Sequence, residues 1–96
     1  MLEDFNASTF KELEDKRFQV GLNENASLNL ELARIDDLPS SARQERFSLF
    51  FTGPLDPFLP QGTYKMEHSQ LGSFELFLVP VARDEDGFSY EAAFNR

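Results

Sequence analysis

Residues 74–81 read Phe-Glu-Leu-Phe-Leu-Val-Pro-Val, and this run sets the tightest limit on how the chain folds. Apolar residues occupy both alternate sets of positions over most of the run. This pattern is typical of a strand that is covered on two sides. It therefore predicts a central strand over residues 73–81, with Phe77 and Val79 buried and the other segments arranged as its partners. Because Pro80 cannot donate to a ladder, we expect this strand to end at a sheet edge or a bulge.

Other segments alternate apolar and polar residues with a period of two, as a strand with one buried face does. They predict strands over residues 17–22, 27–36, 46–52, 63–68 and 88–94. Within the second of these, the apolar phase switches at Ala33, which predicts a bulge there. Residues 36–45 have no apolar pattern and are expected to form a surface loop. Gly72 is expected to adopt the left-handed backbone conformation of a turn.

One short helix is expected near the start of the chain. Thr9 and Glu12 have the spacing of a capping box, in which each side chain bonds a free backbone N–H at a helix start. They predict a helix over residues 9–15. At the other end of the chain, Asp86-Gly87 is the strongest local signal for a hairpin turn.

Length and composition favour one small, mainly β domain over residues 1–96. A chain of this size needs a dense core, and 11 Phe and 2 Tyr supply most of the large apolar area. Aromatic residues also favour strands. Because the connections leave no room for a crossover helix, the strands are expected to be antiparallel. The predicted fold is a meander of about six strands that forms a small barrel or a sandwich.

The acidic character of the chain argues against some classes of partner. The formal net charge is -8 and the pI is about 4.5, so phosphate-covered surfaces would be repelled. We therefore expect no binding to nucleic acid or to an anionic membrane. The acidic start lacks the basic and apolar segments of a secretory signal, and no run approaches the roughly 18 apolar residues of a membrane span. These features predict a cytoplasmic protein.

No motif indicates catalysis, a cofactor or a metal site. His68 and Ser69 are neighbours in a predicted strand, so they point to opposite faces, and no nucleophile elbow surrounds the serine. We expect His68 to bond locally. The run from Asp84 to Gly87 resembles half of a calcium loop but lacks the later ligands. The glycines match no nucleotide-binding spacing. There is no cysteine, hence no thiolate chemistry.

The loop over residues 53–62 is the best candidate for a binding site. Three prolines in ten residues stiffen it, because each proline fixes φ and restricts the residue before it. A stiff loop that presents apolar side chains binds a partner at low ordering cost. The alternative is that Phe58 and Leu59 fold back as a lid on the core. The candidate partner-binding residues are Pro54, Asp56, Pro57, Phe58, Leu59 and Pro60.

These observations predict a non-enzymatic protein-interaction or assembly module, which binds another protein through this loop and through an open sheet edge. The alternative is a small apolar-ligand-binding β-barrel, because a Phe-lined barrel could enclose a lipid or an aromatic compound. That alternative requires an interior cavity of at least roughly 300 Å³. The sequence leaves the oligomeric state open.

A further set of motifs is rich in Phe, Leu, Pro, Gly and Tyr. It comprises Phe47-Ser48-Leu49-Phe50-Phe51-Thr52-Gly53-Pro54, Leu59-Pro60-Gln61-Gly62-Thr63-Tyr64, His68, Leu71-Gly72, Leu76-Phe77-Leu78-Val79-Pro80, Asp84, Gly87, Tyr90-Glu91-Ala92 and Phe94-Asn95. In these motifs the chain resembles a family of small bacterial domains of unknown function. The start of the chain is also similar, except that Asp15 stands where members often have glycine.

The resemblance implies a stand-alone cytoplasmic domain without an assigned activity. Such domains are similar to those often encoded beside phage-tail-collar and tail-fibre-like proteins. This likeness implies an accessory or structural part in a tail-like assembly, and it supplies no catalytic residues.

Overall fold

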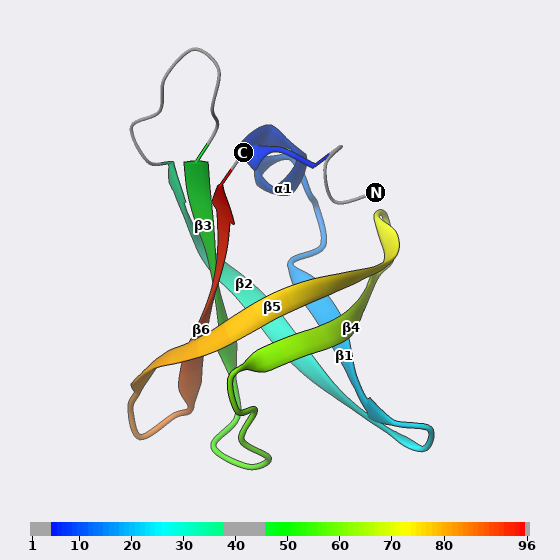
Figure 1. The fold of residues 1–96 in the computed structure, drawn as a ribbon, viewed down its shortest axis with the longest axis vertical. Coiled ribbons are helices and arrows are strands. Elements are labelled where there is room, and N and C mark those ends of the chain that lie inside the picture. The colour runs from blue at the N-terminus through cyan, green and yellow to red at the C-terminus, as the bar shows by residue number, and fades with distance from the viewer. Residues whose placement is uncertain (1–4, 38–45, 96) are drawn as a thin grey trace.

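The computed structural model describes residues 5–37 and 46–95. A short helix is followed by strands that coil around a common axis (Figure 1). The elements are α1 (Ala7–Lys11), β1 (Arg17–Asn23), β2 (Ala26–Asp37), β3 (Arg46–Gly53), β4 (Gly62–His68), β5 (Gly72–Arg83) and β6 (Phe88–Asn95). Each strand begins and ends within a residue or two of its expected bounds. The loop expected over residues 36–45 lies mostly outside the described residues.

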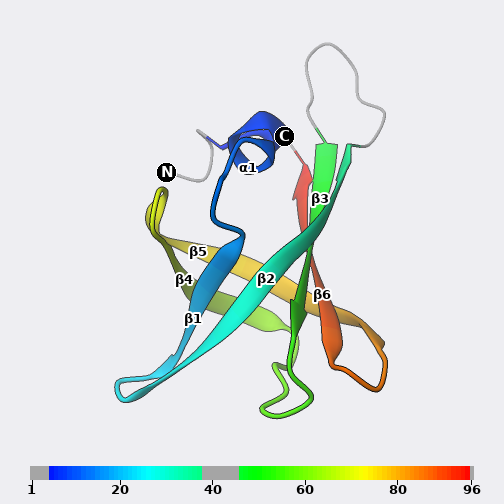
Figure 2. The same ribbon diagram turned by 180° about the vertical axis from the view of Figure 1, so that it is seen from behind.

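The strands pair antiparallel and close into a barrel in the order β1-β2-β3-β6-β5-β4. A mainly β fold with six antiparallel strands and one helix is confirmed, and it is a barrel rather than a sandwich. The open sheet edge expected as a contact surface is absent from the described strands, because each has a neighbour on both sides. Figure 2 shows the barrel wall from behind.

The strand order departs from a simple meander after β3. The chain pairs β3 with β6 and enters β4, which lies between β5 and β1. In a closed ring of this order, β3 and β4 stand on opposite sides. The connection over residues 54–61 therefore has to cross one mouth of the barrel. We call this mouth the loop end (bottom of Figure 1) and the opposite one the helix end.

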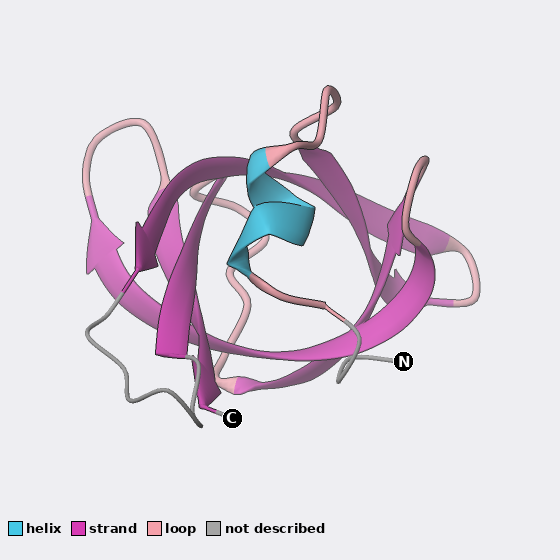
Figure 3. Cartoon of the chain, turned by 90° about the horizontal axis from the view of Figure 1, so that it is seen from above, coloured by secondary structure: helices cyan, strands magenta, loops and turns pink. Residues whose placement is uncertain are grey.

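Helix α1 covers the helix end, as the view along the barrel shows (Figure 3). It is shorter than expected and begins earlier. Asn6 is the N-cap, and its side chain accepts a hydrogen bond from the Thr9 backbone N–H at 2.9 Å. The expected capping box of Thr9 with Glu12 is therefore wrong. Asn6 offers a good cap one turn upstream, and Glu12 is instead the C-cap.

Aromatic rings fill the barrel between its two ends. Phe10 of α1 is fully buried, with ring centroids at 6.1 Å from Phe47 and 5.8 Å from Phe94. Phe47 and Phe94 stack at 4.5 Å where β3 and β6 pair. Further along the axis, Phe18 meets Phe51 edge to face at 5.1 Å. The phenylalanines therefore supply the dense core that a chain of this size needs.

Strand β5 is not covered on two sides, so that expectation is wrong. It pairs with β4 along one edge and with β6 along the other, but only one of its faces points into the barrel. Phe74, Leu76 and Leu78 are buried on that face, whereas Phe77 is 50% exposed and Val79 is half-buried. The barrel wall is a single layer here. The second apolar set of the run is therefore a feature of the outer surface.

Three local predictions about the backbone are confirmed. The register of β2 against β3 shifts between Leu32 and Arg34, which places a bulge at Ala33. The register of β5 against β6 shifts just after Pro80, so the proline lies at a bulge and not at a free edge. Gly72 has a φ of 81° in the turn between β4 and β5.

Candidate functional site

The loop that crosses the loop end is anchored by one residue. The Leu59 side chain is only 2% exposed and belongs to the core. Its backbone N–H donates to the hydroxyl oxygen of Tyr90 at 3.0 Å, in a fully buried position. Tyr90 of β6 thereby holds the middle of the loop against the barrel interior. The expected role as a lid applies to Leu59.

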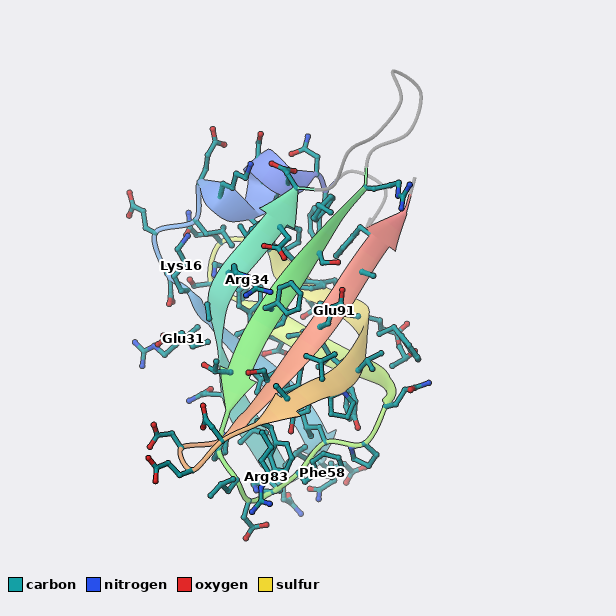
Figure 4. The ribbon with its side chains drawn as sticks, turned by 90° about the vertical axis from the view of Figure 1, so that its left-hand side faces the viewer. Lys16, Glu31, Arg34, Phe58, Arg83 and Glu91 are labelled. Carbon is teal, nitrogen blue, oxygen red and sulfur yellow. The ribbon has the colours of Figure 1, made fainter. Side chains whose placement is uncertain are left out.

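The adjacent residue points the other way. Phe58 is 45% exposed, and its ring centroid lies 4.7 Å from that of Phe88 at the start of β6. Leu55 is 39% exposed, earlier in the same loop. Figure 4 shows Phe58 at the loop end, near Arg83. The binding role expected for Phe58 stays a prediction, whereas the lid alternative holds for Leu59.

The remaining candidate residues lie around these side chains. Pro54 is half-buried, whereas Asp56, Pro57 and Pro60 are exposed. The Asp56–Pro57 peptide bond is cis. The Pro60 carbonyl accepts a hydrogen bond from the Tyr64 hydroxyl, which ties the end of the loop to β4.

Strand β5 also carries exposed apolar side chains, on the outside of the barrel. Phe77 and Val81 are among the most exposed large apolar side chains, the latter at 46%. We call the exposed apolar side chains of the loop, Leu55 and Phe58, the apolar end surface.

Sequence reasoning missed Phe77 and Val81 as surface residues, although a signal was present. The run 74–81 has two apolar sets, and only one can face the barrel interior. In a closed single-layer wall, the second set must lie outside. The same pattern therefore indicates an exposed apolar stripe once the barrel is known.

An acidic turn borders the apolar end surface. In the β5–β6 turn, the Asp84 carboxylate accepts from the backbone N–H groups of Asp86 at 2.8 Å and Gly87 at 3.0 Å. The Asp84 N–H donates in turn to the Gly87 carbonyl at 2.9 Å. Asp84 thus holds the turn together. Among the described residues, no group of three acidic, His or Cys side chains could hold a metal ion.

This turn packs directly against the start of the loop. A Cβ atom placed on Gly87 would lie 1.9 Å from the carbonyl oxygen of Gly53 and 3.5 Å from the Cα of Pro54. Only glycine permits so close an approach of two backbones. The carboxylates of the turn are therefore fixed beside the residues that follow β3.

His68 is a structural residue at the end of β4. It is 5% exposed, and its Nε2 lies 2.6 Å from the Asp15 carbonyl oxygen. Since that oxygen can only accept, Nε2 carries the proton, and Nδ1 accepts from the Gln70 N–H at 3.0 Å. The expectation of local bonding is confirmed. Ser69 donates to the Asp15 carboxylate at 3.3 Å and forms no pair with His68.

Asp15 stabilises the entry to β1. Its carboxylate accepts from the Arg17 backbone N–H at 2.9 Å. This hydrogen bond holds the pKa of the Asp15 carboxyl below its ordinary value of 3.8, with smaller lowering contributions from the Ser69 hydroxyl and the charge of Arg17, while desolvation acts in the opposite direction. The side chain therefore fixes the backbone where the chain enters β1.

The outer wall has hollows that polar and apolar groups line together. One of about 520 Å³ lies over β1, β2, β3 and the acidic turn, and polar groups such as Arg17, Asn29, Glu31 and Thr52 line it. Others of about 390 and 300 Å³ lie beside it on β1 and β4.

The model of one protein family, described as Domain of unknown function (DUF6916), matches residues 5–94 of the chain. The match runs from α1 almost to the end of β6. No curated protein and no solved structure matches the chain significantly. Within the part of the chain that the structure describes, no helix is both long enough and apolar enough to cross a membrane.

Proposed function

We propose, from the premise that the chain belongs to the family described as Domain of unknown function (DUF6916), that it is a non-enzymatic protein-interaction or assembly module. It binds another protein through the apolar end surface. One observation carries the proposal: Leu55 and Phe58 are exposed on a loop whose middle residue, Leu59, is anchored in the core.

The anchor matters because the binding free energy must offset the conformational entropy that the binding groups lose when a partner docks. A loop already held by a buried leucine and by the Tyr90 hydroxyl loses little further freedom when a partner docks. Exposed aromatic side chains on a fixed support are common centres of binding energy. Phe58 is such a side chain, because it is exposed and lies on a loop that Leu59 anchors.

The hydrogen bonds of two titratable residues, His68 and Asp84, support a structural role for both. His68 uses both ring nitrogens on backbone groups, and Asp84 uses its carboxylate to close a turn. Neither is poised to transfer a proton to a substrate. The tail-like assembly implied by the resemblance stays a prediction, as do the cytoplasmic location and the apolar-ligand alternative.

The test is affinity capture from cells of the source organism with matched variants. Leu55→Ser with Phe58→Ser removes the exposed apolar groups and leaves Leu59 in place. Leu22→Ser, at another exposed leucine on the β1–β2 hairpin, is the control. We expect a protein that the wild type and the control recover to be lost by the double variant, with circular dichroism spectra unchanged. Equal recovery by all three would contradict the proposal.

A further inference from the structure

We infer that the partner segment is cationic as well as apolar: the apolar end surface is built for an amphipathic protein segment that carries Lys or Arg beside aliphatic or aromatic side chains. This inference rests on the proposed function and adds the chemistry of the partner. It follows from the charges that surround the exposed apolar groups.

Carboxylates flank the apolar end surface from the loop and from the acidic turn. Asp56 follows Leu55 directly in the loop, and Glu85 and Asp86 belong to the turn. All three are exposed. Within the described part of the chain, their side chains take part in no hydrogen bond or ion pair, so their charges remain available to a partner.

The position of the turn is fixed, not incidental. Gly87 brings it against Gly53 at the start of the loop, and Asp84 locks its conformation. The backbone of the turn that carries Glu85 and Asp86 is therefore held beside the start of the loop. Two cations lie nearby: Arg83 places its guanidinium over the Phe88 ring at 5.8 Å, and Arg17 lines a hollow together with Asp84 and Asp86. The carboxylates of the loop and the turn, which are Asp56, Asp84, Glu85 and Asp86, outnumber these cations.

A Lys or Arg side chain suits such a surface because its aliphatic stem covers apolar area while its charge reaches a carboxylate. Complementary charges also steer the encounter and exclude partners of like charge. A second copy of this chain, with a net charge of -8, would be repelled at the same surface. The charge pattern therefore favours a basic protein segment over self-association.

The probe is a fluorescein-labelled amphipathic peptide of Lys and Leu, about 18 residues long so that it can form a helix, with a Glu and Leu counterpart. Anisotropy titrations are run with the full chain. We expect the Lys peptide to bind and the Glu peptide not to bind. Binding is expected to weaken several-fold between about 50 mM and about 500 mM salt, because exposed charges are screened.

Two variants separate local recognition from net charge. Asp56→Asn, Glu85→Gln and Asp86→Asn together remove the flanking charges without touching Asp84. Since each exposed pair contributes little, the combined loss of affinity is expected to be roughly fivefold or more. The control combines Glu14→Gln, Glu24→Gln and Glu67→Gln, which are exposed elsewhere, and is expected to weaken binding less than about twofold.

The outcomes are distinct from those of the capture experiment. The inference of a cationic partner would be overturned if the wild type did not bind the Lys peptide, or if both triple variants weakened binding equally. In either case, loss of capture in Leu55→Ser with Phe58→Ser would still support the interaction module. Sedimentation that shows self-association, lost in that double variant, would assign the surface to a second copy and would also overturn the inference.

Discussion

Residues adjacent in sequence have opposite roles at the loop end. Leu59 fills the core and donates its N–H to Tyr90, whereas Phe58 lies half in solvent against Phe88. Gly87 has a third role, since it permits two backbones to touch. None of these roles follows from residue type alone, because each depends on an atom that is distant in sequence.

Gly87→Ala should destabilise the protein by about 2 kcal/mol or more, since the added Cβ collides with backbone and cannot be relieved by a rotamer change. The measurement is the free energy of unfolding in urea. Gly21→Ala is the matched control, because its Cβ would lie 3.8 Å from the nearest atom, the Lys65 carbonyl oxygen. Its effect should stay within about 1 kcal/mol. Equal losses would show that the contact of Gly87 with Gly53 does not matter.

At the level of the element, the proline-rich loop and β5 each combine a structural and a surface function. The loop crosses the mouth because β3 and β4 stand on opposite sides of the ring, and a crossing segment must place one side chain inward. Strand β5 must place its second apolar set outward because the barrel wall is a single layer. Helix α1 closes the other mouth with Phe10.

The two parts of the loop can be separated by truncation. Leu59→Ala should cost about 2–4 kcal/mol of unfolding free energy, because it empties a buried site. Phe58→Ala should cost about 1 kcal/mol or less, since it removes one partly exposed ring contact. Chemical denaturation of both variants is the measurement. A larger loss for Phe58→Ala would show that the lid is Phe58 and that the apolar end surface is part of the core.

At the scale of the whole molecule, closure of the barrel depends on one short strand pairing, between β1 and β4, which we call the joint. The ladder between β1 and β4 consists of Gln19 with Glu67 and Val20 with Met66, whereas β3 pairs with β6 over its full length. Beyond this ladder, the β1–β2 hairpin projects from the barrel (Figure 1). The remaining strands and the aromatic core hold the ring together.

Native-state hydrogen exchange should identify this joint as the weakest part of the barrel wall. Amides of β1 and β4 that point toward each other should exchange at a lower opening free energy than those between β3 and β6, because fewer pairs must break. The β3–β6 amides serve as the internal reference. Uniform protection around the ring would mean that the barrel opens only by global unfolding.

Much of the fold was predictable because its signals are local. The alternation of apolar residues locates the strands, and the phase switch at Ala33 locates the bulge. The candidate loop was also found from its prolines. The helix start was not, because both Asn6 and Thr9 are residue types that favour an N-cap, and the structure uses Asn6 as the cap and Thr9 as its partner in the capping box.

The sequence by itself determined where each strand runs, that the strands are antiparallel, and that aromatic rings form the interior, since these depend on periodicity and on turns between near neighbours. The tertiary structure alone decided the order of the ring, the outward position of Phe77, and the division of the loop into Leu59 inside and Phe58 outside. The physical reason is that a period of two gives a strand two faces but does not say what covers each. Strand pairing between distant segments decides that.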